Sequence, residues 1–445
     1  MKKKYFGTDG IRARVGAAPM TVEWLSSLGR AVGSVIQNQG KPIVIGLDTR
    51  ESSVLLGDAF AAGLVAQGHH VILAGVLPTP AIAFLCRHND FQLGAVISAS
   101  HNPYHDNGIK FFCSDGFKLS DEAEAAIEKA VDHIATLPLA ATMGKIESDH
   151  SLAHTYEQYC QTFFPPQALA GLELVLDCAH GATYRLAPAL FGDLGATVHS
   201  LHITPDGRNI NAACGPTDLR VLQQAVKENK AHLGIAFDGD GDRVMMVDGD
   251  GGIVDGDELL WILAAHQLAE HKELPGVVGT LMSNLGLVEA LAENNIPFYR
   301  ANVGDRYVLE ALRKSNWFLG GESSGHLLHL QYGTTGDGLV SALLILQAMV
   351  KAKKPLSELK KGMVKYPQVM INVRHAGGKP DLSSAAIKAA VTDVERQLAG
   401  HGRVLLRASG TEPLIRVMVE GKDAVHTKTQ AETLAAQIQA ILAGV

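Results

Sequence analysis

Residues 41–74, KPIVIGLDTRESSVLLGDAFAAGLVAQGHHVILA, decide the fold class of this 445-residue chain. Residues 41–47 form a short run rich in β-branched side chains, and residues 53–67 place small and apolar side chains at helical spacing. Residues 70–74 are apolar again. This strand, helix, strand order is typical of a mainly parallel sheet covered by helices, so the sequence predicts an α/β fold.

The same order returns twice farther along the chain. Residues 172–177 and 276–282 have the character of strands, and each is followed by a helix and a second strand. The C-terminal part differs, because its strands and its long helix at 427–442 do not alternate strictly. Its predicted strands are residues 369–374, 402–408 and 414–420. This part is therefore expected to form a smaller α+β domain on an antiparallel sheet.

Polar or proline-rich stretches near residues 143–154, 249–256 and 351–367 separate these segments. A usual domain has roughly 100–200 residues, which predicts three or four domains for a chain of this length. The expected domains are residues 1–152, 153–253, 254–366 and 367–445. The first three are expected to be similar α/β domains with mixed, mainly parallel sheets.

Composition limits the classes of function. Apolar residues make up 47% of the chain and charged residues 19%, which fits a globular protein with large cores. A net charge of −7 argues against nucleic acid as the main partner. Five scattered cysteines without a CxxC pair indicate reduced thiols. Neither a signal peptide nor the roughly 20 apolar residues of a membrane span is visible, so a cytoplasmic protein without membrane contact is expected.

A hydroxyl-rich turn, ISASHNP at residues 97–103, follows the apolar run at 93–97. A side chain at the end of a buried strand lies where α/β proteins place their ligands. Ser100 could therefore act as a nucleophile, but a serine hydroxyl needs a base or a cation to do so. Taken alone, the segment favours a simple turn or a helix N-cap, where serine is common.

An acidic run, DGDGDR at residues 238–243, could supply that cation. Its carboxylates belong to Asp238, Asp240 and Asp242, and the glycines between them allow a tight turn on which all three converge. An all-oxygen set suits Mg²⁺. A calcium loop is disfavoured because its twelfth position is Gly249, where a glutamate is required. A solvated acidic turn is the alternative, although three close carboxylates without a cation would repel one another.

A glycine-rich segment, GGESSGH at residues 320–326, offers groups for a sugar. Glu322 and Ser324 could bind sugar hydroxyls, and His326 could transfer protons. The alternative is an ordinary loop with a capping serine.

Two further segments offer groups for phosphate. RASGTEP at residues 407–413, with Arg416 beyond it, combines hydroxyls, an exposed backbone and two arginines. FGTDGIR at residues 6–12 ends in Arg12, which could neutralise a phosphate. By contrast, the histidines at 69–70, His199 and His202 have no carboxylate or cysteine companion at metal-binding spacing and are expected to be surface or strand residues. Because none of the Gly-x-Gly patterns opens a helix, a nicotinamide cofactor is not expected.

Together these five segments resemble, in order and across essentially the whole chain, the α-D-phosphohexomutase family. ISASHNP is similar to the family's phosphoserine loop, DGDGDR to its metal loop, GGESSGH to its sugar loop and RASGTEPLIR to its phosphate-binding loop. The resemblance implies four domains around one central cleft, with a smaller last domain that moves to close it. FGTDGIR and the stretch NVGDRYV at 302–308 resemble the branch that acts on glucosamine phosphates.

The resemblance implies a reaction that interconverts glucosamine 6-phosphate and glucosamine 1-phosphate and feeds UDP-N-acetylglucosamine and cell-wall precursor synthesis. The phosphoryl group would be carried by Ser100 and pass through a 1,6-bisphosphate, and glucosamine or glucose 1,6-bisphosphate would be the activator. One Mg²⁺ would be held by a phosphoserine oxygen of Ser100 and by the three aspartates of the metal loop. A phosphomannomutase or phosphoglucomutase of the same family remains an alternative, as do a metal-dependent phosphatase and a non-catalytic sugar-phosphate sensor.

The resemblance also assigns roles to individual residues. Lys110 matches the family's candidate general base, and His101 is a second candidate. Arg12 and Arg243 would add positive charge near the transferred phosphoryl group. The other phosphate of the substrate would bind to a cradle made of Arg407, Ser409, Gly410, Thr411 and Arg416. The expected partner is a phosphosugar, and the expected state is a monomer or homodimer.

Overall fold

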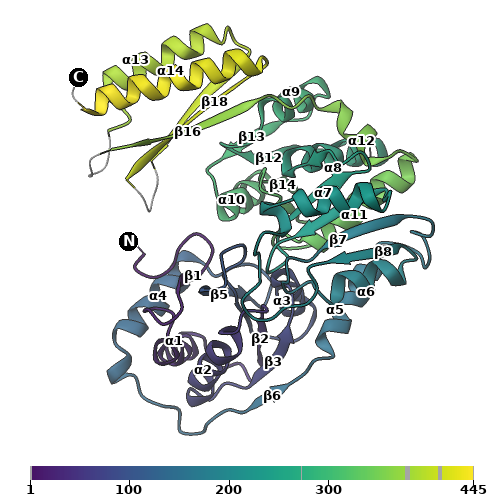
Figure 1. Ribbon diagram of the computed structural model, residues 1–445. Helices are drawn as coiled ribbons and strands as arrows, with labels where there is room; N and C mark the ends of the chain where they lie inside the picture. The colour runs from purple at the N-terminus through teal and green to yellow at the C-terminus, as the bar shows by residue number, and fades with distance from the viewer. Residues whose placement is uncertain (1–2, 272, 376–380, 409–412, 444–445) are drawn as a thin grey trace. The chain divides into compact units, whose positions relative to one another are not determined.

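The computed structural model describes residues 3–271, 273–375, 381–408 and 413–443 (Figure 1). The chain divides into two compact units. The first contains Met1–Thr280 and Tyr299–Lys361, and the second contains Leu281–Phe298 and Gly362–Val445. Within the part of the chain that the structure describes, no helix is both long and apolar enough to cross a bilayer.

The N-terminal domain of the first unit is built on a six-stranded sheet with the order β1-β5-β4-β2-β3-β6. The four neighbouring strands β4, β2, β3 and β6 are parallel. Strand β5 pairs antiparallel with β4, and the edge strand β1 pairs antiparallel with β5. The strands are β1 (Ile11–Arg14), β2 (Ile43–Leu47), β3 (Val71–Val76), β4 (Leu93–Ile97), β5 (Asp106–Cys113) and β6 (Ile146–Ser148). The predicted strand, helix, strand order at 41–74 is confirmed, with a helix between β2 and β3.

Helices cover both faces of this sheet. Helices α1 (Val22–Val35) and α2 (Ser53–Ala66) pack against each other in one core that also holds Ile43 and Ile45 of β2 (Figure 1). Helix α3 (Thr79–His88) contacts β2, β4 and β5, and α4 (Asp121–Asp132) packs against α1. Strand β4 is buried along its whole length, as expected for a strand covered on both faces.

The second α/β domain follows helix α5 (Leu152–Gln161) and has a five-stranded sheet with the order β11-β10-β9-β7-β8. Its strands are β7 (Glu173–Asp177), β8 (Thr197–Leu201), β9 (Leu233–Phe237), β10 (Val244–Asp248) and β11 (Ile253–Val254), and its helices are α6 (Leu186–Asp193) and α7 (Arg220–Glu228). Helix α6 begins at Leu186, after a turn in which Ala179 and His180 have left-handed backbone conformations.

The third α/β domain has a four-stranded sheet with the order β13-β12-β14-β15. Its strands are β12 (Val277–Thr280), β13 (Phe298–Ala301), β14 (Leu319–Gly321) and β15 (Leu327–His329). Its helices are α8 (Gly256–His271), α10 (Asp305–Ser315), α11 (Gly338–Ala352) and the short α12 (Leu356–Leu359). Strands β12 and β14 are parallel, and the short β14–β15 hairpin is antiparallel.

The second unit contains the predicted α+β domain. Strands β16 (Gln368–Arg374), β17 (Gly402–Ala408) and β18 (Leu414–Gly421) form an antiparallel sheet with β18 in the centre. Helices α13 (Ala385–Gln397) and α14 (Ala424–Ala443) pack on it around one apolar core (Figure 1). Helix α9 (Leu285–Glu293) also lies in this unit, and its N-cap residue Asn284 exchanges two hydrogen bonds with the backbone of Tyr366.

Candidate active site

Ser100 and Asp238 are in direct contact although 138 residues separate them in the chain. Ser100 Oγ donates a hydrogen bond to Asp238 Oδ2 at 2.7 Å, and both residues are buried. Ser100 follows β4 and Asp238 follows β9, so the ends of strands from two different sheets meet here. The sequence predicts that the serine hydroxyl and the acidic run act together. In the structure the two are in direct contact.

A buried ion pair below the Ser100 loop holds its backbone. Arg50 Nε donates to Asp48 Oδ2 at 2.7 Å, and Arg50 Nη2 donates to the carbonyl oxygens of Ser100 (2.9 Å) and Asn102 (2.8 Å). Ser98 joins the same group, because its Oγ donates to Asp48 and accepts from the Ser100 backbone N–H. Ser100 has a φ of +53°, a left-handed conformation that is uncommon for residues other than glycine. The ion pair thus supports a strained turn of the kind found at functional sites.

Glycines allow the acidic loop to approach this turn. A Cβ at Gly239 would lie 2.7 Å from the carbonyl oxygen of Ser100, so a larger residue would push the two loops apart. Gly241 has a φ of +73°, which L-residues rarely adopt. These two positions therefore bring the three aspartates close to the serine.

Asp238, Asp240 and Asp242 form a buried cluster whose ligand oxygens lie within 4.8 Å of one another. Asp240 Oδ1 and Asp242 Oδ1 are buried and have no hydrogen-bond partner among the described residues. Buried carboxylate oxygens without partners are costly, and three convergent oxygen donors suit a hard divalent cation. The residues present therefore fit the metal ion that the sequence indicated.

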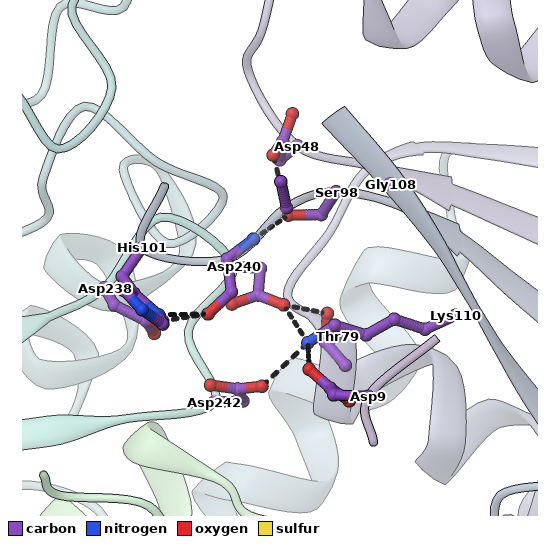
Figure 2. A network of polar contacts seen from close by, with 12 residues as sticks. Asp9, Asp48, Thr79, Ser98, His101, Gly108, Lys110, Asp238, Asp240 and Asp242 are labelled. Carbon is purple, nitrogen blue, oxygen red and sulfur yellow. Dashed lines mark hydrogen bonds and ion pairs between the residues drawn. The ribbon is translucent and has the colours of Figure 1, made fainter. Parts of the chain in front are cut away.

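The side chain of Lys110 partly balances the negative charge of the aspartate cluster. Its Nζ donates to Asp240 Oδ2 at 2.8 Å and to Asp242 Oδ2 at 2.9 Å, and it pairs with Asp9 Oδ2 at 2.9 Å (Figure 2). Burial alone would lower the pKa of Lys110, but the charges of Asp240, Asp242 and Asp9 together raise it well above the usual value. The lysine is therefore protonated in this arrangement, whereas the role of general base predicted from the sequence needs a lowered pKa.

Burial and neighbouring charges also shift the pKa values of the aspartates. Burial, together with the charges of Asp242 and Asp240, raises the pKa of Asp238 well above its usual value. Burial also acts to raise the pKa of Asp242, but Lys110 and His326 hold it well below the usual value. The carboxylates can thus all be ionised only when more positive charge is near them.

His101 is the second predicted base and lies next to the serine. Its Nδ1 is 3.3 Å from Ser100 Oγ. Burial, with the charges of Arg243 and Arg12, lowers the pKa of His101 to about 4. The imidazole is therefore neutral near pH 7 and able to accept a proton.

A cavity of about 360 Å³ in the first unit brings several predicted residues together. It is lined by the N-terminal segment, by the loops after β4 and β9, and by parts of the third domain. The predicted residues in its wall are Arg12, His101, Asp242, Arg243, Glu322 and His326. Ser324 stands in the same turn as Glu322 and is partly exposed, but it is not part of the lining of this cavity.

The β14–β15 hairpin carries the predicted sugar loop. Glu322 Oε1 accepts a hydrogen bond from the backbone N–H of Gly304 at 3.0 Å. His326 lies between two carboxylates, with Nδ1 3.6 Å from Asp242 Oδ1 and Nε2 3.7 Å from Asp305 Oδ2. Burial alone would lower the pKa of His326, but these two carboxylates raise it above the usual value. The two carboxylates therefore favour the protonated form of His326 at the cavity wall.

The structure adds charged residues that the sequence did not single out. Asp9 pairs with Arg12 at 2.5 Å and with Lys118 at 2.6 Å, and Lys118 also contacts Asp305. Burial alone would raise the pKa of Asp9, but Lys110, Lys118 and Arg12 hold it well below the usual value. Asp9 belongs to the FGTDGIR segment and Asp305 to NVGDRYV. The sequence singled out both segments but assigned no role to these two carboxylates.

The predicted phosphate cradle belongs to the second unit. Arg407 of β17 and Arg416 of β18 lie directly opposite each other in the antiparallel register, and both are exposed. Two like charges facing each other across a strand pair repel, and an anion between them would remove that repulsion. The other predicted cradle residues, Ser409, Gly410 and Thr411, lie outside the described residues.

Four family domains match the chain in order. They are described as the alpha/beta/alpha domains I, II and III and the C-terminal domain of phosphoglucomutase/phosphomannomutase, and they match residues 3–137, 154–252, 255–366 and 370–437.

Sequence relatives match over nearly their full length. A phosphoglucosamine mutase of Aeromonas hydrophila is 50% identical over 441 residues, which is 99% of both chains. A phosphoglucosamine mutase of Haemophilus ducreyi is 50% identical over 440 residues, covering 98% of this chain and 99% of the relative.

Solved structures share the fold at lower identity. A phosphoglucomutase/phosphomannomutase family protein from Burkholderia thailandensis superimposes with a TM-score of 0.80 at 22% identity, covering 97% of each chain. The N-acetylphosphoglucosamine mutase of Aspergillus fumigatus, in complex with GlcNAc-6P and magnesium, has a TM-score of 0.68 at 17% identity and covers 99% of this chain and 96% of that one. The chain belongs to the phosphoglucomutase/phosphomannomutase family, and within it to the phosphoglucosamine mutases.

Proposed function

We propose that this protein interconverts glucosamine 6-phosphate and glucosamine 1-phosphate by way of a phosphorylated Ser100. The contact of 2.7 Å between Ser100 Oγ and Asp238 carries the proposal, because it joins a hydroxyl nucleophile to a carboxylate cluster fitted for a hard cation. The relatives named phosphoglucosamine mutase, which are 50% identical to this chain, support an amino sugar as the substrate.

The reaction begins with phosphorylated Ser100. The bond between phosphorus and Ser100 Oγ breaks while a new phosphorus–oxygen bond forms to the 1-hydroxyl of glucosamine 6-phosphate. The proton of that hydroxyl passes to a base in the cavity, and the leaving Ser100 Oγ takes up a proton from that base or from solvent to end as a hydroxyl. The resulting 1,6-bisphosphate turns end for end, its 6-phosphoryl group returns to Ser100, and glucosamine 1-phosphate leaves. A free hexose 1,6-bisphosphate, of glucosamine or glucose, would activate an enzyme that lacks the phosphoryl group.

Asp238, Asp240 and Asp242, with an oxygen of the phosphorylated Ser100, would hold one Mg²⁺. When bound, such a cation spreads the negative charge that develops on the phosphoryl group in transfer. Arg12 and Arg243, which both line the 360 Å³ cavity, add positive charge from the protein side.

Two residues are candidates for the base. His101 is neutral near pH 7 and lies 3.3 Å from Ser100 Oγ, but its pKa of about 4 makes it a weak base. Lys110 suits the role only when the charge of its carboxylate partners is neutralised, because those carboxylates keep its proton in place.

Candidate substrate-binding residues occur in each of the two units. Glu322 and His326 in the cavity wall would bind the sugar hydroxyls, with Ser324 in the same turn. Arg407 and Arg416 would hold the phosphate that is not being transferred, together with Ser409, Gly410 and Thr411. We further propose that residues 1–152, 153–253, 254–366 and 367–445 are the four domains. We also propose a monomer or homodimer that works in the cytoplasm, where its five free cysteines remain reduced.

A kinetic comparison tests this function. We expect kcat/KM for glucosamine 6-phosphate to exceed the values for glucose 1-phosphate and mannose 1-phosphate by at least about 10-fold, which corresponds to ~1.4 kcal/mol of discrimination. A preference for glucose or mannose phosphates would instead assign the chain a phosphoglucomutase or phosphomannomutase activity. Release of inorganic phosphate at the rate of substrate loss would point to a phosphatase.

A further inference from the structure

A second cluster of metal-ligating side chains lies in the second α/β domain, apart from the aspartate cluster. It consists of Asp177 at the end of β7, His202 directly after β8, and Cys214 in the loop before α7. One ligand atom from each residue lies within 4.8 Å of the other two. Asp177 and Cys214 are fully buried. The sequence offered His202 no acidic or cysteine companion, and only the fold brings these three side chains together.

Asp177 and His202 form a close ion-pair contact, which raises the pKa of His202. His202 Nδ1 lies 3.0 Å from Asp177 Oδ1, yet this buried nitrogen has no aligned hydrogen-bond partner among the described residues. Zinc-bound nitrogen and oxygen atoms lie about 2.0–2.2 Å from the metal, which puts them about 3.3 Å from each other in a tetrahedral site. The observed spacing is close to that of two atoms directed at a shared ion.

The donor set selects a class of metal. It offers one imidazole nitrogen, one sulfur and one carboxylate oxygen, a combination that binds Zn²⁺ and similar transition metals and is poorly suited to Mg²⁺ or Ca²⁺. The side chain of His202 is 21% exposed, which leaves a route for the ion and a place for a water ligand. The three aspartates near Ser100 are all oxygen donors, so the two clusters prefer different ions.

The surrounding backbone holds the ligands in position. Asp177 Oδ1 accepts from the N–H of Ala179 and Asp177 Oδ2 accepts from the N–H of Gly215, both at 2.9 Å. These bonds orient the carboxylate, as outer contacts do in metal sites, and leave lone pairs on both oxygens. His202 has a φ of +52° and Ala213 has the same value, a conformation that costs free energy for these residue types.

We propose that Asp177, His202 and Cys214 bind one transition-metal dication of the zinc class. A metal–sulfur bond forms as Cys214 loses its thiol proton to solvent, and water completes the coordination. The site has a direct connection to the reacting serine. Asn211, three residues before Cys214, donates from Nδ2 to the carbonyl oxygen of Ser100 at 2.9 Å. A bound ion would restrain the loop that carries Asn211 and would thereby support the Ser100 turn.

Cobalt absorption tests the site, because Co²⁺ substitutes for Zn²⁺ and gives a strong near-ultraviolet band only when a thiolate is a ligand. Metal-free, full-length protein is titrated with Co²⁺ in excess Mg²⁺, which occupies the aspartate cluster. We expect a thiolate-to-cobalt band that saturates at one equivalent and is abolished by Zn²⁺. If wild-type protein gives no such band, the proposal is wrong.

Three variants identify the ligands. Cys214→Ser should abolish the band, and His202→Asn should weaken cobalt binding by more than about 100-fold, because the loss of an outer contact alone costs 10–100-fold. Asparagine tolerates the left-handed backbone at this position, so the second variant remains informative if the first fails to fold. Cys178→Ser is the matched control, since Cys178 is a buried neighbour outside the cluster, and it should keep the band. A band that survives in Cys214→Ser, or that disappears in Cys178→Ser, would overturn the assignment.

Discussion

The guanidinium of Arg50 donates a hydrogen bond from Nη2 to the carbonyl oxygen of Ser100, at 2.9 Å. The same guanidinium also donates to the carbonyl oxygens of Asn102, Pro103 and Asp106, so a single side chain holds four points of the loop. Its charge is balanced by Asp48, and both side chains are fully buried. The position of Ser100, the proposed nucleophile, therefore depends on a residue that does not line the cavity.

Replacing Arg50 should lower the rate without weakening substrate binding. A lysine keeps the positive charge beside Asp48 but cannot donate in the planar geometry that reaches several carbonyls. In Arg50→Lys we expect kcat to fall by ~10- to 100-fold with little change in KM, because small displacements of a nucleophile cost about that much. Steady-state kinetics measures both. Arg208→Lys, at an exposed arginine paired with Glu51, is the control and should behave like wild type. A changed KM with an unchanged kcat would contradict this role.

Ser100→Ala should abolish turnover and leave the fold intact, because the hydroxyl makes one hydrogen bond to Asp238 and one close contact with His101. Intact-mass measurement after incubation with glucose 1,6-bisphosphate gives a direct readout. Wild-type protein should gain one phosphoryl group and the variant none. Ser27→Ala, at a serine bonded only to the backbone of its own helix, should gain the group as wild type does. Phosphoryl gain in Ser100→Ala would exclude this serine as the carrier.

Asp240→Asn should weaken the response to magnesium. The change removes one charge from the cluster, and the amide can still contact Thr79 and Lys110. Since a catalytic cation contributes several kcal/mol, we expect kcat to fall by about 100-fold and the Mg²⁺ concentration for half-maximal activity to rise. Titration of activity with Mg²⁺ after chelator treatment measures both quantities. The control is Asp218→Asn, at a partly buried carboxylate paired with the exposed Arg220. An unchanged magnesium response would remove Asp240 from the ligand set.

Arg416→Ala should raise KM for the phosphosugar by about 10- to 100-fold, because a hydrogen bond to a charged group contributes about 1.5–3 kcal/mol. Arg407, directly opposite, loses a repulsive neighbour, so the variant should be as stable as wild type or slightly more stable. Arg396→Ala, at an exposed arginine of α13 paired with Asp393, is the control. Equal KM values for Arg416→Ala and wild type would mean that the substrate phosphate binds elsewhere.

Asp337 should make stability depend on pH in a defined direction. Burial raises the pKa of Asp337 from 3.8 to about 6, although the hydrogen bond from Tyr156 acts to lower it. Between about pH 4 and pH 6 the folded protein thus binds more protons than the unfolded chain. The stabilising contribution is complete below about pH 4 and is lost as pH rises through about 6.

Asp337→Asn cannot ionise, and its amide can still accept from the N–H of Val340. The melting temperature of this variant should therefore rise relative to wild type as pH increases from about 4 to 7, by an amount equivalent to ~3 kcal/mol. Thermal denaturation across this pH range measures the difference. The matched change Asp193→Asn, at an exposed carboxylate of α6, should leave the difference from wild type constant. A constant difference for Asp337→Asn would show that Asp337 does not titrate in this range.

The sequence was sufficient for features that depend on neighbours within a few residues. The apolar runs located β2 and β3 and the helix between them, and β2 is buried along most of its length, as expected for a strand covered on both faces. The spacing of Asp238, Asp240 and Asp242 after β9 indicated a metal site, since alternating glycines allow three carboxylates to converge. The strands of the last domain were located in the same way.

Only the tertiary structure decided which distant segments meet. Lys110 lies among Asp9, Asp240 and Asp242, and these carboxylates raise its pKa. A lysine that acts as a general base would need a lowered pKa instead. Asp177 and His202 become neighbours because β7 and β8 are paired in parallel, so that their ends lie side by side. Local sequence sets the preference for strand, turn or helix, but the charge around a side chain comes from loops that the packing of whole sheets brings together.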